Sequence, residues 1–489
     1  MSYLDKSIIE IHEALVKKEI SVTSLVQEAL KRAHENKDNA FEIILDDLAL
    51  KKAKECDEKG IDENNYFYGI PYVAKDNFST KDIKTTGSSN ILNGYIPLFD
   101  ATVIKYLNDA GAILIAKATL DELAMGGTGT SGHKGNTYNP YDEKHEHMIG
   151  GSSCGSAVAV SAGIVPFSLG SDTGDSVRKP ASNSGLVGFK PTWGLISRFG
   201  LFPFAPSLDH VAYFTRSVED SALLLNLLSK HDDNDATNSY KPRSDYFKNL
   251  DSNIKGKKIA IINEILETIK DETLLAKFNK SLDYLKNEGA SIEYVSVSKE
   301  LLNAIFPSYF IISCSEATSN NANLDGIKFG PSYGGKTYQE VMFNARTKGF
   351  SPLIKRRFVI GSYSLMSQNQ HDLFLRAQKA RRLIVEAFND VFKNYDAIYM
   401  LASPKVAPKF NEDSDKLSST YLIADNYLAY GNFGGYPSIT IPLGFKDDMP
   451  FGANITASPF NEECVFDIAL SIEKFTGLKD LDVNTKGGK

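Results

Sequence analysis

Cysteine is scarce in this sequence, and long hydrophobic runs are missing. The 489 residues include 4 cysteines, at positions 56, 154, 314 and 464, and these do not have the paired spacing of a disulfide or zinc motif. No apolar run reaches the roughly 18 residues that a membrane helix needs. The first residues, MSYLDKSIIE, lack the basic-then-apolar pattern of a signal peptide. These absences predict a reduced, cytoplasmic chain that does not enter a membrane.

Positive charge is not in excess either. The formal net charge is −7 and the sequence pI is about 5.7. Such a chain has no extended basic surface for wrapping nucleic acid, so if RNA takes part, we expect a partner chain to hold most of it. With 42% hydrophobic and 24% charged residues, the composition is that of a globular protein with a large core.

The most informative segment, Gly150 to Pro180, has a serine site on either side of an apolar run. The first site reads GGSS, and its first serine is Ser152. The second site reads TGDS and ends at Ser176. The nearly uncharged run between them predicts a buried helix that leads into a buried strand. Gly/Ser loops are often simple turns, but glycine also lets backbone N–H groups face a ligand. Two hydroxyls with several such N–H groups indicate acyl chemistry.

Two further residues near these sites have side chains that can react. Lys75 ends an apolar, strand-like run, GIPYVAK. It is either an ordinary surface lysine or a residue whose pKa is lowered by desolvation, and a neutral lysine can act as a general base. Cys154 lies inside the first serine site, where we expect a small buried side chain in preference to a nucleophilic thiol.

The order of expected elements predicts an α/β fold with a central, mixed, mostly parallel sheet covered by helices on both faces. Helices are expected twice within 6–34 and over 45–59, 103–111, 120–125, 218–229, 273–289 and 365–392, and strands over 112–117, 185–190, 213–217, 257–263, 397–401 and 437–443. We expect a single domain with N-terminal helices over 6–60, a core over 65–220 that contains the serine and lysine sites, a C-terminal part over 255–480 and a disordered tail over 484–489.

The residues around these sites resemble the amidase signature family. The resemblance rests on GIPYVAKDN, DELAMGG, GGSSCGSA, LGSDTGDSVRKPAS, GLVGFKPTWG and SLDHVAYFTRSVED, and it extends from Ile8 to about Gly477. Within the family, SYFIISCSEATSNNANLDGIKFG, KGFSPLIKRRFVIGSY and YDAIYMLASP are similar to segments of the glutaminase subunits of tRNA-dependent amidotransferases. The resemblance implies the amidase-signature fold.

The resemblance also implies a Ser-Ser-Lys triad. Ser176 matches the nucleophile, Ser152 the serine held on a cis peptide bond, and Lys75 the base. A hydroxyl nucleophile needs a base, and two serines in series can relay its proton to the lysine. The backbone N–H groups implied to bind the oxyanion are those of Thr173, Gly174, Asp175 and Ser176.

A glutamine pocket is implied as well. Arg357, whose planar guanidinium suits a carboxylate, is expected to bind the α-carboxylate, and Asp425 the α-ammonium group. Tyr309 is expected to hydrogen-bond the substrate, with Met125 and Gly126 also at the binding site. Without the resemblance, Arg357 and Asp425 would be interpreted as surface ion-pair residues.

Three residues depart from the family pattern. Asp175 stands where the family usually has glycine, directly before the nucleophile. Aspartate keeps its backbone N–H and tolerates left-handed backbone better than most residues, so we expect its side chain to point away from the oxyanion and activity to persist. Cys154 replaces a usual glycine and His210 a usual glutamine, and nothing in the sequence explains either.

These implications predict a glutaminase subunit that releases ammonia from glutamine. The expected complex is a heterotrimer with a tRNA-binding kinase/transamidase subunit and a small third subunit. The kinase/transamidase subunit would bind most of the tRNA and would use ATP and Mg²⁺ to convert Glu-tRNA(Gln) to Gln-tRNA(Gln). We expect no cofactor and no metal in this chain itself.

Other classes of protein fit some of the same residues. A free-standing amidase would act on small amides without partners, and a scaffold subunit would have lost activity through Asp175. A Ser-His-Asp site with Asp209 and His210 is disfavoured, because adjacent side chains in a strand point to opposite faces. A metal site at 145–147 is disfavoured because the HEH spacing does not suit one helix face.

Overall fold

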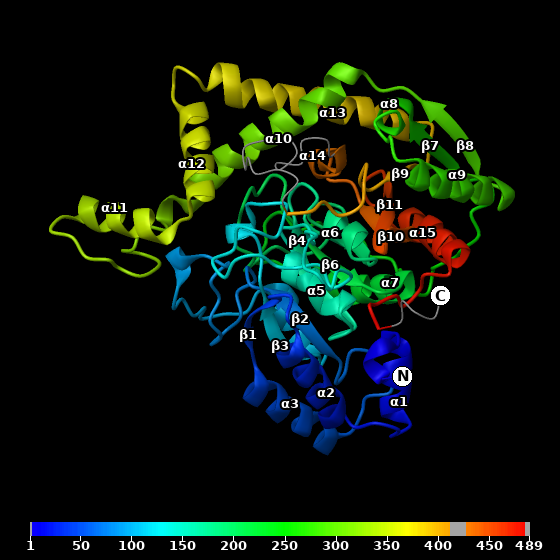
Figure 1. Ribbon diagram of the computed structural model, residues 1–489, viewed down its shortest axis with the longest axis horizontal. Helices are drawn as coiled ribbons and strands as arrows, with labels where there is room; N and C mark the ends of the chain where they lie inside the picture. Colours follow the sequence, from blue (N-terminus) through cyan, green and yellow to red (C-terminus); the bar gives the residue numbers. More distant parts are fainter. Residues whose placement is uncertain (1, 411–426, 485–489) are drawn as a thin grey trace.

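The computed structural model describes residues 2–410 and 427–484 (Figure 1). The described residues contain an 11-stranded sheet in the order β1-β3-β2-β4-β6-β5-β10-β11-β9-β7-β8. Strands from both halves of the chain share this sheet, and β5 lies next to β10 where the halves meet. The strands are β1 (Phe41–Ile44), β2 (Pro71–Lys75), β3 (Ile113–Ala118), β4 (Phe167–Asp172), β5 (Val187–Lys190), β6 (His210–Thr215), β7 (Lys258–Ile262), β8 (Ser291–Val295), β9 (Ala397–Leu401), β10 (Ser438–Lys446) and β11 (Met449–Ala457).

Parallel and antiparallel pairs are combined in this sheet. β2 is parallel to β3 and β4, and β7 is parallel to β8 and β9. The other six pairings are antiparallel. The α/β class and the mixed sheet are confirmed, but most pairs are not parallel. Hydrophobic patterns mark strands without giving their direction, and the β10–β11 hairpin turns at Asp447 and Asp448 without a crossover helix.

Helices cover both faces of the sheet, and a group of helices extends beyond one end of it, with α11 as a projecting arm (Figure 1). Within that group, α10 packs against α12 and α13. The helices are α1 (Ile8–Val16), α2 (Val22–Glu35), α3 (Asp46–Lys59), α4 (Thr102–Asp109), α5 (Cys154–Ser161), α6 (Arg178–Asn183), α7 (Val218–Leu228), α8 (Asn263–Leu266), α9 (Glu272–Asn287), α10 (Lys299–Asn320), α11 (Tyr338–Gly349), α12 (Pro352–Leu365), α13 (Arg376–Phe392), α14 (Tyr430–Phe433) and α15 (Glu462–Thr476), with short turns η1 (Tyr3–Asp5), η2 (Asn90–Leu92), η3 (Glu122–Ala124), η4 (Asn321–Asn323), η5 (His371–Leu375) and η6 (Tyr427–Ala429).

Most expected elements are present, with their ends shifted by a few residues. The helix expected over 365–392 starts later than predicted: α12 ends at Leu365, a turn follows, and the helix resumes at His371 with the π-helical η5 and continues as α13 to Phe392. There, the side chain of Asn369 donates a hydrogen bond to the carbonyl oxygen of Tyr363 at 3.0 Å and closes the end of α12. The helix expected over 120–125 is only the short turn η3, and β1, β8, β11, α10 and α15 were not predicted.

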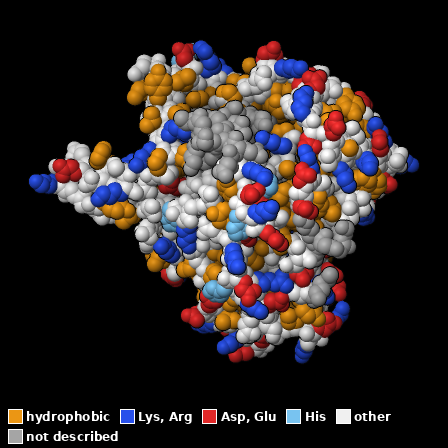
Figure 2. All heavy atoms as spheres, in the orientation of Figure 1, with side chains coloured by type: hydrophobic (Ala, Val, Ile, Leu, Met, Phe, Trp, Pro, Cys, Tyr) orange, Lys and Arg blue, Asp and Glu red, His pale blue; other side chains and the backbone are white. Residues whose placement is uncertain are grey.

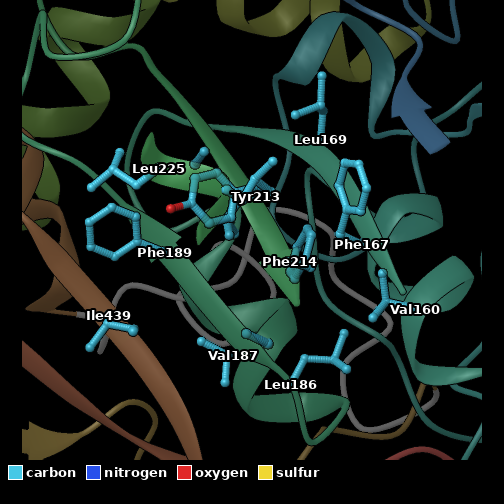
Figure 3. Close-up of a cluster of buried hydrophobic side chains, with 14 of the residues drawn as sticks. Val160, Phe167, Leu169, Leu186, Val187, Phe189, Tyr213, Phe214, Leu225 and Ile439 are labelled. Atoms are coloured by element: carbon cyan, nitrogen blue, oxygen red, sulfur yellow. The ribbon is translucent and has the colours of Figure 1, made fainter. Parts of the chain in front are cut away.

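Buried aromatic and branched side chains hold the middle of the sheet to its helices (Figure 3). Phe167, Phe189, Tyr213 and Phe214 are each 0% exposed. Burial of one such side chain stabilises the fold by about 1.5–3 kcal/mol. Tyr213 also donates its hydroxyl proton to the carbonyl oxygen of Ser221 on α7, at 2.7 Å. This rigid core fixes β4, from which one of the predicted serine loops starts.

The parallel pair β2–β4 determines where the predicted site lies. Ala74 on β2 is in register with Leu169 on β4. Because parallel strands end at the same edge of a sheet, Lys75 at the end of β2 lies beside the end of β4. The GGSS loop directly precedes α5 and the TGDS loop directly follows β4, so both loops meet Lys75 at this edge.

The remaining expectations concern membrane helices, surface charge, Asp425, the C-terminal tail and the domain division. None of the described helices is long and apolar enough to cross a membrane. Lys and Arg side chains are interspersed with Asp and Glu over the face shown in Figure 2. Asp425 and the tail 485–489 lie outside the described residues. The division into one domain with three parts stays a prediction.

Candidate active site

Lys75 is 0% exposed, and its amine lies among the hydroxyl groups of three serines. Nζ lies 2.8 Å from Ser152 Oγ, 2.9 Å from Ser153 Oγ and 2.9 Å from Ser171 Oγ. An ammonium group has three N–H donors, so each donor has a hydroxyl oxygen to bind. The structure therefore brings together two of the predicted triad residues, Lys75 and Ser152. Ser153 and Ser171 were not predicted to contact the lysine.

The loop that carries Ser152 is fixed by Asp121. The Gly151–Ser152 peptide bond is cis, as the resemblance implies. The backbone N–H of Asp121 donates to the carbonyl oxygen of Ser152 at 3.1 Å, and the Asp121 carboxylate accepts hydrogen bonds from the backbone N–H groups of residues 128–131. Gly151 must be glycine here, because a Cβ would lie 2.0 Å from Asp121 Oδ2. Sequence analysis missed Asp121, whose one signal is its place in DELAMGG.

The loop that carries Ser176 is held at both ends by a buried ion pair between Asp172 and Arg178. Both side chains are 0% exposed, and Arg178 Nη2 lies 2.9 Å from Asp172 Oδ1. Burial alone would raise the pKa of Asp172, but the Arg178 guanidinium brings it well below its ordinary value. The other Asp172 oxygen accepts from the backbone N–H of Val177 at 3.0 Å, and Asn432 accepts from Arg178 at 2.7 Å.

Arg178 also holds the backbone of this loop from one side. Arg178 Nη2 donates to the carbonyl oxygen of Gly174 at 2.8 Å. In a trans peptide the following N–H points the opposite way, so the N–H of Asp175 faces away from Arg178. No described residue accepts a hydrogen bond from the N–H of Gly174 or of Ser176. Asp175 itself is half-buried.

Ser176 is 3% exposed and lies next to the GGSS loop. Its carbonyl oxygen accepts a hydrogen bond from the backbone N–H of Ser153 at 3.2 Å, which joins the two serine loops. Within the described part of the chain, the Ser176 hydroxyl has no hydrogen-bond partner, and no hydrogen bond links it to Ser152. The Ser152–Lys75 hydrogen bond is formed, and catalytic hydrogen bonds often tighten only when substrate binds.

Burial has a strong effect on the charge of Lys75. Desolvation lowers its pKa to about 7, although the charges of Asp121, Asp172 and Asp209 act in the opposite direction. A large fraction of Lys75 is therefore neutral at physiological pH and able to accept a proton. Of the two alternatives, Lys75 is therefore the desolvated lysine and not an ordinary surface lysine.

Tyr309 and Arg357 lie on the same side of the site. Gly174 packs directly against the Tyr309 ring, since a Cβ at position 174 would lie 2.8 Å from Tyr309 Cζ. The Arg357 guanidinium lies 5.1 Å from the centre of the Phe310 ring, and its Nη1 is buried with no hydrogen-bond partner. Burial raises the pKa of Tyr309, and the charge of Arg357 opposes that effect. An unpaired guanidinium nitrogen whose charge acts on Tyr309 suits an anionic substrate group.

Met125 and Gly126 belong to the loop that Asp121 organises. Met125 is 1% exposed, and its backbone N–H donates to the carbonyl oxygen of Glu122 at 3.0 Å. Gly126 lies against Asp121, because a Cβ there would lie 2.4 Å from Asp121 Cγ. The binding roles of Met125 and Gly126 stay predictions, and Asp425 lies outside the described residues.

Comparison with known proteins identifies the family. Residues 24–466 match the protein-family model described as Amidase. This chain belongs to the amidase family. The family match and the eleven-stranded α/β structure confirm the fold that the sequence motifs implied.

Individual amidase-family members are similar over nearly the whole chain. The A subunit of glutamyl-tRNA(Gln) amidotransferase from Pediococcus pentosaceus is 39% identical over 479 residues, which cover 97% of this chain and 98% of the relative. The same subunit of Persephonella marina is 40% identical, with 98% of each chain covered. The crystal structure of this subunit from Thermotoga maritima has a TM-score of 0.80 at 34% identity, covering 97% of this chain and 95% of that one. The peptide amidase of Stenotrophomonas maltophilia has a TM-score of 0.80 at 25% identity, covering 97% and 98%.

Cys154 does not have the character of a nucleophile in this amidase. It is 1% exposed, and burial raises the pKa of its thiol to about 12. Its Sγ lies 3.6 Å from the carbonyl oxygen of Thr119. A buried thiol with a raised pKa is unreactive, so the interpretation of Cys154 as a small buried side chain fits best.

Asp209 and His210 are structural neighbours of the site. Asp209 accepts a hydrogen bond from Thr173 Oγ1 at 2.7 Å. His210 Nδ1 lies 2.7 Å from the carbonyl oxygen of Leu208 and donates to it, which leaves Nε2 to accept from Lys190 Nζ at 3.3 Å. Glutamine also offers one donor and one acceptor, so His210 can replace it. Neither Asp209 nor His210 has a hydrogen bond to Ser176 within the described residues, which argues against a Ser-His-Asp site.

The expected absence of a metal motif at 145–147 has a structural explanation. His145 pairs with Asp38 at 3.1 Å, Glu146 with Lys409 at 2.7 Å, and His147 with Asp142 at 2.6 Å. Each side chain therefore has a separate protein partner. In the described ranges 2–410 and 427–484, no group of three or more His, Cys, Asp or Glu side chains could hold a metal ion.

One motif was overlooked in the sequence. Residues 330–337 read GPSYGGKT, which fits the G-x-x-x-x-G-K-[ST] spacing of a phosphate-binding loop. No described strand leads into this segment, since β8 ends at Val295 and α10 and η4 intervene. The backbone N–H of Lys336 donates to Glu340 Oε2 at 2.6 Å, so a carboxylate of the protein occupies the helix N-terminus. The segment lacks the context of a phosphate-binding loop.

Replacement of Asp172 tests the anchoring of the nucleophile loop. Asp172→Asn leaves Arg178 buried without its counter-charge, and we expect the free energy of unfolding to fall by about 3–5 kcal/mol. Amide hydrolysis should fall at least tenfold because the loop amides lose their fixed positions. Denaturant titration and a rate assay measure these effects. The control is Asp233→Asn at a side chain that is 89% exposed, and an Asp172→Asn protein as stable as this control contradicts the account.

Proposed function

We propose that this chain is the glutamine-hydrolysing subunit of a tRNA-dependent amidotransferase. The observation that carries the proposal is the fully buried Lys75, which contacts Ser152 and has a pKa lowered to about 7. The sequence similarity to A subunits of glutamyl-tRNA(Gln) amidotransferases over nearly the full length supports the substrate.

The chemistry follows from the positions of these groups. Ser176 Oγ attacks the side-chain amide carbon of glutamine, while its proton passes to Ser152 and the Ser152 proton passes to Lys75. The N–H groups of Gly174, Asp175 and Ser176 stabilise the oxyanion, with Thr173 as the fourth expected donor. When the C–N bond breaks, the protons return along the same path to the leaving nitrogen, and ammonia departs.

Hydrolysis of the ester completes the cycle. The glutamyl group is then bound to Ser176 Oγ. Water attacks the ester carbonyl as the Ser152–Lys75 pair accepts its proton. The C–O bond to Ser176 breaks, the Ser176 oxygen regains a proton, and glutamate leaves. No redox change and no metal are needed in these steps.

Glutamine is held by the pocket beside the nucleophile loop. Arg357 binds the α-carboxylate, for which its buried and unpaired Nη1 is suited. Tyr309, which packs on Gly174, donates a hydrogen bond to the substrate, and Met125 and Gly126 contribute to the binding loop. Asp425 binds the α-ammonium group.

The ammonia serves a partner in a cytoplasmic heterotrimer. A tRNA-binding kinase/transamidase subunit uses ATP and Mg²⁺ to activate Glu-tRNA(Gln), and a small third subunit completes the complex. Exposed apolar side chains on α12 and at its C-cap support a partner surface: Val359 is 68% and Tyr363 56% exposed on the helix, and Met366 is 46% exposed at the cap. The four cysteines are free and buried, in keeping with a reducing compartment.

A free-standing amidase is the second candidate, favoured by the similarity to peptide amidase. Ammonia release from glutamine distinguishes the two functions, measured for this chain alone and with both partners, ATP and Glu-tRNA(Gln). We expect release to appear or rise strongly only in the full mixture, and to vanish in Ser176→Ala. Because neutral Lys75 is the base, kcat/KM should rise with pH through about 7 and then level off.

Equal release by the chain alone and in the full mixture would favour the free-standing amidase. No release in either condition would favour an inactive scaffold. A rate that does not depend on pH between about 6 and 8 would contradict the role of Lys75 as the base.

Asp175 provides a separate prediction. Its backbone N–H is retained, so Asp175→Gly should change the rate of ammonia release by less than tenfold. The same assay measures this change, with Asp233→Gly as an exposed control. A gain of more than tenfold in Asp175→Gly would contradict this prediction and mean that the carboxylate repels the oxyanion. Loss of the backbone donor itself would lower the rate by about 100- to 1000-fold.

A further inference from the structure

We propose that Ser171 is a positioning residue that directs the proton-accepting lone pair of Lys75 toward Ser152. The inference rests on the proposed function, in which Lys75 is the base. Ser171 supplies two of the four oxygens near Lys75 Nζ, with Oγ at 2.9 Å and the carbonyl oxygen at 3.4 Å. It lies on β4, five residues before the nucleophile, and is 3% exposed.

Ser153 can only accept a hydrogen bond from Lys75. Its hydroxyl donates its single proton to the carbonyl oxygen of Ser171 at 3.0 Å, and Ser153 Oγ also accepts from the backbone N–H of Ser171 at 3.3 Å. Ser153 is 0% exposed, so water does not compete for these bonds. The backbone of Ser171 thus fixes the direction of the Ser153 hydroxyl.

The Ser171 hydroxyl is itself held by Asn77. Asn77 Nδ2 lies 3.0 Å from Ser171 Oγ, and the Asn77 side chain is buried, 1% exposed. If the amide is turned over, its oxygen, which is otherwise buried without a partner, accepts the Ser171 proton instead. In that orientation the Ser171 hydroxyl donates its single proton to Asn77, so Ser171 Oγ can only accept a hydrogen bond from Lys75.

The consequence appears when Lys75 loses a proton. A neutral amine has two N–H donors and one lone pair. Ser153 and Ser171 take the two donors, so the lone pair faces the third neighbour, Ser152, at 2.8 Å. This is the direction from which the proton of the proposed relay arrives. Without Ser171, the amine can rotate about its Cε–Nζ bond and turn the lone pair away.

Other charged or titratable groups near Lys75 must be held constant in a test. Asp121 faces it from the loop before η3, Asp172 from the end of β4, Asp209 from the segment before β6, and Cys154 from the start of α5. The three carboxylates favour the ammonium form, whereas the Cys154 thiol, with its pKa raised to about 12, stays neutral near pH 7. None is altered by a substitution at Ser171, so a change in the titration of Lys75 reports on the lost hydroxyl.

The test measures the rate at which an alkyl phosphonofluoridate labels Ser176, as a function of pH. Ser176 Oγ forms a bond to phosphorus, fluoride leaves with the P–F electron pair, and the Ser176 proton passes through Ser152 to Lys75. The reaction depends on the base but needs no glutamine and no partner chain. Mass spectrometry identifies the labelled serine, and Ser176→Ala is the blank.

We expect the wild-type labelling rate to rise with pH through about 7. In Ser171→Ala, the ammonium form loses an acceptor, so the rise should move about one unit to lower pH. The plateau rate should fall about tenfold, since the lone pair is no longer directed. Ser171→Cys nearly preserves the side-chain volume, and its weaker acceptor should give a smaller shift in the same direction if Ser171→Ala does not fold.

Ser168→Ala is the matched control. Ser168 lies on the same strand, is 0% exposed, and donates to the carbonyl oxygen of Ser156 at 2.7 Å. It should lose stability without moving the pH profile. The inference is overturned if the Ser171 variants keep the wild-type profile and plateau, or lose rate only as Ser168→Ala does. If wild-type protein is not labelled at Ser176, the proposed nucleophile fails and the inference with it.

Discussion

The burial of one amine among hydroxyl groups is the constraint on which this site depends. Burial disfavours the ammonium form of Lys75 and lowers its pKa to about 7. A carboxylate in direct contact would reverse that effect. The nearby Asp121 and Asp172 are engaged elsewhere, Asp121 by backbone N–H groups and Asp172 by Arg178. Hydroxyl oxygens accept hydrogen bonds from the ammonium form, and the Ser152 hydroxyl can also donate to the neutral amine.

The nucleophile loop depends on a second buried arrangement. The Asp172–Arg178 pair holds the carbonyl oxygen of Gly174, and through the geometry of the peptide it also orients the next N–H. Gly174 is in close contact with Tyr309, because a Cβ at position 174 would lie 2.8 Å from Tyr309 Cζ. The buried ion pair and the packing of Tyr309 thus both fix the position of Gly174.

Sequence analysis could predict the parts of the site that are local in the chain. Lys75 ends an apolar strand and the two serine sites flank an apolar run, so periodicity and composition locate them. Hydrogen bonds between distant segments have no such signal: Asn432 is 254 residues from Arg178, and Ser171 is 96 residues from Lys75. Strand direction was predicted poorly for the same reason, because pairing partners such as β5 and β10 come from different halves of the chain.

The central claim is that glutamine is cleaved through an ester on Ser176, and trapping that ester tests the claim most directly. Protein that is turning over glutamine is quenched in acid and digested, and its peptides are analysed by mass spectrometry. The account predicts one glutamyl group on the peptide that contains Ser176, absent in Ser176→Ala. A glutamyl group on Cys154, or turnover with no modified serine, would contradict it.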